Sequence, residues 1–487
     1  MKKHNLLKVV LLVLLLVVIG TWFLPVYVAS NGEFTIQESA KIGIFNIATY
    51  LGIAFQVFGP TIFYVLSVGG LYGVLYRIPQ YRLLLDKVVD AFKDREWLFM
   101  TIVSVVIALL SSMAGLSFML IILFPFIISV ILLMGYDKMT AAMLTVGSVI
   151  AGLIGSVFCA SAVEGISAIF YETMQNDAMN IAKFDVIWKI ALLVVSEALV
   201  LINTFMYAKK HRNSDVDLEN SRLVPKKVKA NNGKIYPLVI VFDVLLIVLT
   251  LGYMSWDLLG VDLFKKMTDG FINPTGTTFV KGLYGALNTV LGVGINSSMN
   301  VNNTFGAWAS STGYEAALVV FMASALISFL YRGSFNNFVN ATGEGVKRAL
   351  RPALLVVIAY IILVIAVTVP YEFSFLRHII DLNGFNLFVM CIVAIVFSFL
   401  TIEPYYGPVT AVSYITSSAV VTGNTGIIAL VWQTMYGLTM LISPTSVALL
   451  VTLSYLDISY SKWLKAVWKL FLELFALILI ILLLFNR

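Results

Sequence analysis

Hydroxyl side chains interrupt an apolar run near the C-terminus. Ser443, Pro444, Thr445 and Ser446 lie inside a stretch long enough to cross a bilayer. Proline has no amide proton and clashes with the preceding turn, so a continuous helix is not expected there. Backbone groups freed at membrane depth must bind protein groups or line a polar cavity. The break is therefore either a kinked structural helix, with hydroxyls bonded to its own turn, or one wall of a solute site.

A second polar interruption combines an acid with two aromatic rings. Glu403 is followed by Tyr405 and Tyr406 between two apolar arms. A carboxylate at membrane depth could hold a substrate ammonium, a sodium ion or a proton. The two rings could add cation–π contacts. The alternative is a wet tip that merely exposes Glu403.

Other acids interrupt apolar segments singly. Glu164 is the counterpart of Glu403 in the first half of the chain, or else a residue of an outer loop. Glu197, Asp243 and Glu473 lie inside predicted spans. These three either relay protons or pair with a hydroxyl or amide of a neighbouring helix.

The composition is that of a membrane protein. Of the 487 residues 60% are hydrophobic and 12% are charged, whereas soluble domains carry about 25% charged residues. Many apolar runs reach the roughly 20 residues that a spanning helix needs. The two cysteines, Cys159 and Cys391, lie in apolar runs, so no disulfide framework is expected. The positive net charge fits basic cytoplasmic loops and requires no nucleic acid partner.

The sequence shows none of the signatures of the common catalytic and nucleotide-driven classes. It contains no P-loop and no nucleophile elbow, and its three histidines and two cysteines form no zinc-type set. We therefore expect neither an enzyme nor a cofactor.

Basic clusters indicate how the chain crosses the membrane. Residues 6–29 form a retained first helix rather than a cleaved signal peptide. Residues 209–234 contain eight Lys or Arg and three acids and form a cytoplasmic linker. We expect about nine spanning helices in the cell membrane, with the N-terminus in the cytoplasm and the C-terminus outside. We also expect a surface helix over 43–58 and separate spans over 60–75 and 352–370. Residues 257–313 receive no placement.

Two pairs of short apolar arms predict re-entrant hairpins. The first covers about 98–134, and its small tip contains Ser112, Gly115 and Ser117. Two full spans joined by a tight turn are the alternative. The second covers about 385–421 and has Glu403 at its tip.

The halves 1–208 and 235–487 align as an internal repeat. The first hairpin tip falls opposite Glu403, and Cys159 to Ser161 falls opposite Pro444 to Ser446. Broken helices are therefore expected over about 140–163 and 425–455. Basic residues place the two copies in opposite orientations, so the predicted fold is an all-α polytopic membrane protein with an inverted repeat, two re-entrant hairpins and two broken helices. Such a fold can support alternating access, with tips and breaks meeting at the midplane.

Several short motifs, in order along most of the chain, resemble the YfcC/ArcD-like family. They include residues 442–446 and 459–465, and also Arg95-Glu96-Trp97, Gly135-Tyr136-Asp137 and 207–210. That family of basic amino acid antiporters is related to anaerobic four-carbon dicarboxylate carriers within the ion transporter superfamily. The resemblance implies a scaffold plus a transport core, and a homodimer. It also implies a site that includes Ser443, Thr445, Ser446, Gly437 and Thr439.

The chain departs from the family at its polar positions. Phe118 and Met119 stand where members usually carry two acids, and Cys159 to Ser161 replace an Asn-Pro. The preferred prediction is a secondary transporter of basic (arginine- or ornithine-like) or other amino acids, which works by exchange or by coupling to a proton or sodium ion. A carrier of small carboxylates and a transporter-derived partner subunit that no longer transports are the alternatives.

Overall fold

The computed structural model shows helices throughout its described part, apart from one short β-hairpin. It describes residues 5–30, 33–37, 41–116, 118–159, 162–163, 165–167, 169, 186–212, 223–226, 234–254, 256, 259–261, 314–371, 386–404, 406–409, 411 and 425–485. Seven of its helices are long and apolar enough to cross a membrane. The predicted class, an all-helical polytopic membrane protein, is confirmed.

The first half begins with α1 (Asn5–Phe23), the strands β1 (Val26–Ser30) and β2 (Glu33–Gln37), and α2 (Ile44–Leu75). It continues with α3 (Pro79–Ala91), α4 (Glu96–Met113), the 3₁₀ turn η1 (Phe118–Ile122), α5 (Phe124–Leu133), α6 (Lys138–Ile154) and α9 (Val186–Lys210). The second half contains α10 (Tyr236–Tyr253), α14 (Tyr314–Leu330), α15 (Phe335–Thr368), α17 (Leu387–Leu400), α19 (Thr425–Met440), α20 (Val447–Leu456) and α21 (Tyr460–Phe485).

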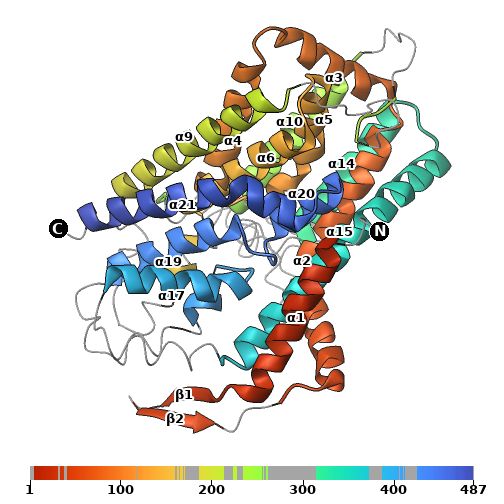
Figure 1. Ribbon diagram of the computed structural model, residues 1–487. Helices are drawn as coiled ribbons and strands as arrows, with labels where there is room; N and C mark the ends of the chain where they lie inside the picture. Colours follow the sequence, from red (N-terminus) through yellow and green to blue (C-terminus); the bar gives the residue numbers. More distant parts are fainter. Residues whose placement is uncertain are drawn as a thin grey trace, which may run out of the picture.

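Helices α2 and α15 pack side by side as the scaffold of the molecule (Figure 1). Gly69 and Gly73, spaced as in GxxxG, face Gly345, so the two backbones touch. A Cβ on Gly345 would lie 2.1 Å from the Gly69 carbonyl oxygen, which leaves room for no other residue.

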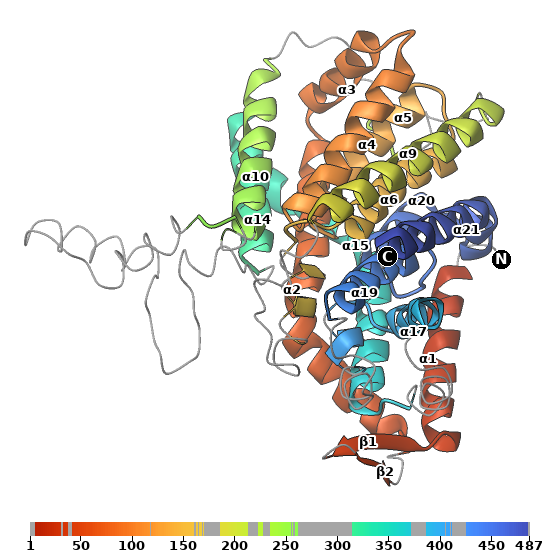
Figure 2. The ribbon, with the colours of Figure 1, turned by 90° about the vertical axis from the view of Figure 1, so that its left-hand side faces the viewer.

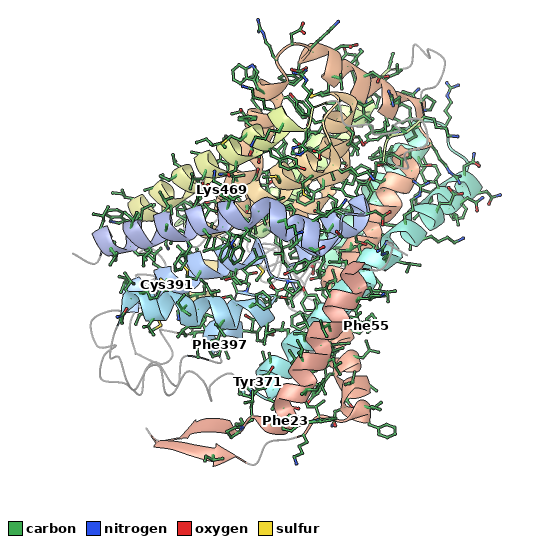
Figure 3. The ribbon with its side chains drawn as sticks, viewed as in Figure 1. Phe23, Phe55, Tyr371, Cys391, Phe397 and Lys469 are labelled. Atoms are coloured by element: carbon green, nitrogen blue, oxygen red, sulfur yellow. The ribbon has the colours of Figure 1, made fainter. Side chains whose placement is uncertain are left out.

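Each scaffold helix packs against the helix that precedes the other scaffold helix in the sequence. Helix α1 packs on α15, and α14 packs on α2. Figure 2 shows α14 and α10 together along one flank of α2. At the far end of α1, the ring of Tyr371 lies against Gly20, near the label of Phe23 in Figure 3. This crossed pairing fits the predicted internal repeat, whose boundaries stay a prediction.

Two predicted helix boundaries are wrong. Helix α2 runs unbroken through Pro60, and α15 runs through Pro352. The predicted surface helix over 43–58 is thus the first part of α2, and the span predicted from Pro352 begins with the N-cap Ser334. One missing backbone hydrogen bond does not end a long apolar helix, because its neighbouring turns and the packed partner helix hold it.

The first predicted hairpin, α4 to α5, returns to the end from which it starts. Arg212 forms an ion pair with Glu96 at the start of α4, at 2.7 Å. The same guanidinium lies 5.5 Å from the ring centroid of Tyr136, which follows α5. Between these ends, Ala114 and Leu116 of the tip are buried. The tip is thus enclosed by protein, as a re-entrant hairpin requires.

The return arm of this hairpin is fixed to α2. Tyr64 donates a hydrogen bond to the Met119 carbonyl at 2.7 Å, and Tyr72 donates one to the Ile122 carbonyl at 2.6 Å. Of the second hairpin, α17 and residues 401–404, 406–409 and 411 are described, and the rest of its return arm lies outside the described residues.

Candidate functional site

The break between α19 and α20 is present where the sequence places it. Ser443, Thr445 and Ser446 are buried. Ser443 and Thr445 contact the Phe399 carbonyl at the end of α17, at 2.8 and 3.2 Å, and their own hydroxyls are 2.7 Å apart. The break is therefore tied to the second hairpin rather than bonded only to its own turn.

Helix α21 satisfies the carbonyl groups that the break frees. Trp463 donates a hydrogen bond to the Leu441 carbonyl at 2.9 Å, and Tyr460 donates one to the Ile442 carbonyl. Just before the break, Thr439 donates to Met435 in its own helix at 2.6 Å. These carbonyls have protein partners, as membrane depth demands.

Glu403 is held by the scaffold. The Tyr360 hydroxyl of α15 lies 2.8 Å from the Glu403 carboxylate and 3.1 Å from the Thr61 hydroxyl of α2. Since a phenol has one hydrogen, Tyr360 donates to Glu403 and accepts from Thr61. Phe58 stacks on Tyr360 at 4.1 Å and meets Tyr406 edge to face at 5.9 Å. Tyr405 lies outside the described residues.

The first hairpin tip docks on the end of α6. The Ser112 hydroxyl donates to the Gly155 carbonyl at 2.6 Å, and the Ser112 carbonyl accepts from the Val157 and Phe158 amides at 3.1 and 3.2 Å. Gly115 forms the turn with φ of 67°, a conformation that side chains other than glycine rarely adopt. Ser117 lies outside the described residues.

The first break follows α6, which ends at Ile154. Beyond it Cys159 is buried and its backbone pairs with that of Met254, after α10. Ser161 and Glu164, both predicted site residues, lie outside the described residues.

The two breaks meet where α6 crosses α19. Gly437 packs on the backbone of Leu153 and Ile154. Gln433 donates a hydrogen bond to the Ser156 carbonyl at 2.7 Å. On the other side of α19, Trp432 meets Phe397 of α17 (labelled in Figure 3) edge to face at 5.8 Å. Described parts of both breaks and of both hairpins therefore belong to one packed group.

Lys189 of α9 and Gln433 of α19 are polar residues of this group that were not predicted from the sequence. Lys189 of α9 is only 4% exposed, and with Gln433 and Ser167 it lines a cavity of about 10 Å³ between α9, α19 and the segment after the first break. A single lysine inside the apolar run of a predicted span is the signal that could have found it.

A larger cavity lies between the scaffold helices α2 and α15 on one side and η1, α5 and α20 on the other. It measures about 70 Å³ and is lined mainly by apolar residues of α2, η1, α5, α15 and α20. Arg348 stands at its edge, 5.8 Å from the centroid of the Tyr76 ring. Its lining suits an apolar group better than a doubly charged solute.

Comparison with known protein families decides the class. Residues 4–486 match the family described as DcuC, C4-dicarboxylate anaerobic carrier. The chain belongs to this carrier family. It is therefore a multi-pass membrane transporter by family, with a small-molecule substrate. The predicted relation to dicarboxylate carriers is confirmed, whereas the amino acid antiporter identity finds no support, and the match favours the carboxylate alternative.

Two solved transporter structures are similar to this carrier at low identity. The Alcanivorax borkumensis YdaH transporter is 14% identical over 98% of both chains, with a TM-score of 0.42. Neisseria gonorrhoeae MtrF, from a class of antimetabolite efflux pumps, is 12% identical over 98% of this chain and 94% of its own, with a TM-score of 0.37. Comparison with curated proteins gives no match.

Proposed function

We propose that this carrier moves C4-dicarboxylates across the cell membrane by alternating access. The observation that carries the proposal, beside the family, is the buried side chain of Lys189, which lines a cavity between α9, α19 and the segment after the first break. A positive charge at this depth would attract a substrate carboxylate strongly, because little water is present to screen the pair.

The same lysine argues against a basic amino acid as substrate. Arginine or ornithine would bring a second positive charge close to Lys189, and like charges repel strongly where water is scarce. Glu403 could offset that charge, but its carboxylate already accepts a hydrogen bond from Tyr360 of the scaffold.

The cavity beside Lys189 is too small for the proposed substrate in this conformation. A volume of about 10 Å³ accommodates roughly one water molecule. A four-carbon acid therefore enters only if α9 and α19 separate. Such an opening, alternating between the two sides, is the motion that an inverted repeat supports.

The residues predicted from the sequence form the rest of the proposed site. The break residues Ser443, Thr445 and Ser446 would form one wall, and Glu403 would lie at the second hairpin. The first turn of α20 carries no side-chain cap, so its amides keep partial positive charge that suits a second carboxylate. Ion coupling, the homodimer and a cytoplasmic N-terminus belong to the same proposal.

Counterflow in proteoliposomes tests the function. We expect the full-length protein to exchange radiolabelled succinate for internal succinate, fumarate or malate, and not for arginine or ornithine. Lys189→Met should lower succinate counterflow at least about tenfold, since one charge-assisted hydrogen bond is worth roughly 1.5–3 kcal/mol. Lys189→Arg should retain part of it. Lys209→Met, at the exposed end of α9, is the matched control and should transport normally.

Two results would overturn the proposal. Arginine exchange without succinate exchange would restore the amino acid hypothesis. Absence of counterflow for a broad panel of acids and amino acids, in protein that elutes as a single species, would favour a partner subunit that no longer transports.

A further inference from the structure

A buried acid lies at the junction of the first hairpin, the first broken helix and α9. Glu197 of α9 is 7% exposed, and its Oε1 is hydrogen-bonded to the hydroxyl of Ser104 on α4. The Ser104 hydroxyl lies 2.6 Å from the hydroxyl of Ser148 on α6. Ser148 in turn lies 2.6 Å from the Leu144 carbonyl oxygen. These four oxygens form a continuous chain.

The chain of oxygens needs one more hydrogen than its hydroxyls supply. It has three oxygen–oxygen contacts, yet Ser104 and Ser148 contribute one hydrogen each. A protonated Glu197 provides the third. Glu197 then donates to Ser104, Ser104 donates to Ser148, and Ser148 donates to the Leu144 carbonyl. All three contacts are satisfied only when the carboxyl group carries a proton.

Loss of that proton reverses the two hydroxyls. Ser148 would donate to Ser104 and Ser104 to the carboxylate, which leaves the contact between Ser148 and Leu144 without a hydrogen. The second carboxyl oxygen, Oε2, is buried and has no hydrogen-bond partner within the described chain. A carboxylate with one donor in an apolar membrane protein is costly, so a change in proton occupancy here must accompany a change in the packing around it.

The helices packed around Glu197 carry their charges elsewhere. Glu96 and Lys138 lie at the first residues of α4 and α6. Helices α5, α19 and α20, which pack on α6, have no Asp, Glu, Lys or Arg. On α21, Lys469 pairs with Glu473 at 3.3 Å, and Glu473 also accepts from Asn203 of α9 at 2.7 Å. The remaining charges of α9 and α21 are those of Lys189, Lys209, Lys210, Lys462 and Lys465.

Glu197 is placed where its proton can act on the proposed substrate site. It follows Lys189 by two helical turns on α9, about 12 Å along the axis. Its partners lie on α4 and α6, whose far ends meet at the contact between Ser112 and Gly155. Movement of α9 against α4 and α6 would break the oxygen chain and open the Lys189 cavity together.

We propose that Glu197, with Ser104 and Ser148, is a proton-binding site through which transport is coupled to the proton gradient. A proton from the aqueous phase binds the carboxylate, both hydroxyls turn toward Leu144, and the three helices lock; release of the proton to the other side reverses these steps. The coupling role depends on the proposed function, whereas proton binding itself does not.

Transport of succinate into proteoliposomes tests the coupling. Glu197→Gln keeps a donor toward Ser104 and imitates the permanently protonated acid, so succinate counterflow measured at equal pH on both sides should no longer change with that pH. The stimulation of uptake by an inward proton gradient should disappear. Glu473→Gln, which removes another acid within a span, is the matched control and should keep the stimulation. Stimulation that persists in Glu197→Gln, or a sodium gradient that drives uptake through Glu197 instead, would overturn the proposal.

Infrared spectroscopy tests proton binding without any substrate. The unmodified protein and Glu473→Gln should show a protonated-carboxyl carbonyl band that is lost at high pH and is missing from Glu197→Gln. Ser104→Ala removes the hydroxyl that contacts the carboxyl group, so the frequency of this band should shift. An identical band in Glu197→Gln would refute the site. If succinate counterflow fails while this band behaves as expected, the proposed function is wrong and the proton site stands.

Discussion

Gly437 of α19 lies directly on the backbone of Ile154 at the end of α6. A Cβ on Gly437 would be 2.6 Å from the Ile154 nitrogen and 2.8 Å from the Leu153 carbonyl carbon. Backbone atoms cannot move aside as a flexible side chain does, so this crossing fixes the distance between the two broken helices. The first break can meet the second only because position 437 has no side chain.

Gly437→Ala should therefore destabilise the protein. Forcing a methyl group into a close-packed crossing costs roughly 1–3 kcal/mol. We expect a lower melting temperature in detergent and reduced succinate counterflow. Gly52→Ala, in α2 with nothing within 4 Å of the added Cβ, is the control and should melt at the same temperature or higher. Equal melting of both variants would show that the crossing is looser than described.

The paired hydroxyls of the second break should stabilise the end of α17. In Ser443→Ala combined with Thr445→Val, the Phe399 carbonyl loses both donors inside the protein. An unsatisfied buried polar group costs about 1–3 kcal/mol, so thermal stability should fall. Thr452→Val removes a hydroxyl bonded only to Ala448 in its own helix and should change stability little. If both variants behave alike, the tie between the break and α17 contributes nothing measurable.

Tyr360 and Glu403 should be energetically coupled. Tyr360→Phe keeps the ring that stacks on Phe58 but removes the donor to the carboxylate. Glu403→Leu removes the carboxylate that accepts from Tyr360. A double-mutant cycle on thermal stability should give a coupling of about 0.5–3 kcal/mol. Additive effects would mean that Glu403 finds its partner elsewhere, as at a wet hairpin tip.

Thiol labelling should distinguish a re-entrant hairpin from two full spans. In a background of Cys159→Ala and Cys391→Ala, whose wild-type side chains are both buried, cysteines at Arg95, Lys138 and Lys210 should react with an impermeant maleimide from one side. A cysteine at Lys41 should react from the opposite side. One at Ala114, in the buried tip, should react from neither. Labelling of position 114 from the side of Lys41 would establish two full spans.

Much of the architecture can be predicted from local properties of the sequence. Long apolar runs specify helices at membrane depth, because no other open structure satisfies its own backbone there. Pro444 with its flanking hydroxyls marks a true break, since α19 and α20 are separate helices. Pro60 and Pro352 look similar in sequence yet lie inside α2 and α15. A proline removes one hydrogen bond wherever it stands, and the packing around it decides whether the helix ends.

Only the tertiary structure decides which helix faces meet. Apolar helices share one period and resemble one another, so a sequence alone cannot pair Ser104 with Glu197 or place Lys189 beside Gln433. Those partners lie on different elements, and their contacts depend on how α4, α6, α9 and α19 rotate and cross. The sequence determined that this is a polytopic helical carrier with polar breaks. The packing of glycines and hydroxyls between helices determined where those breaks meet, because in a membrane close contact rather than hydrophobicity selects the neighbours.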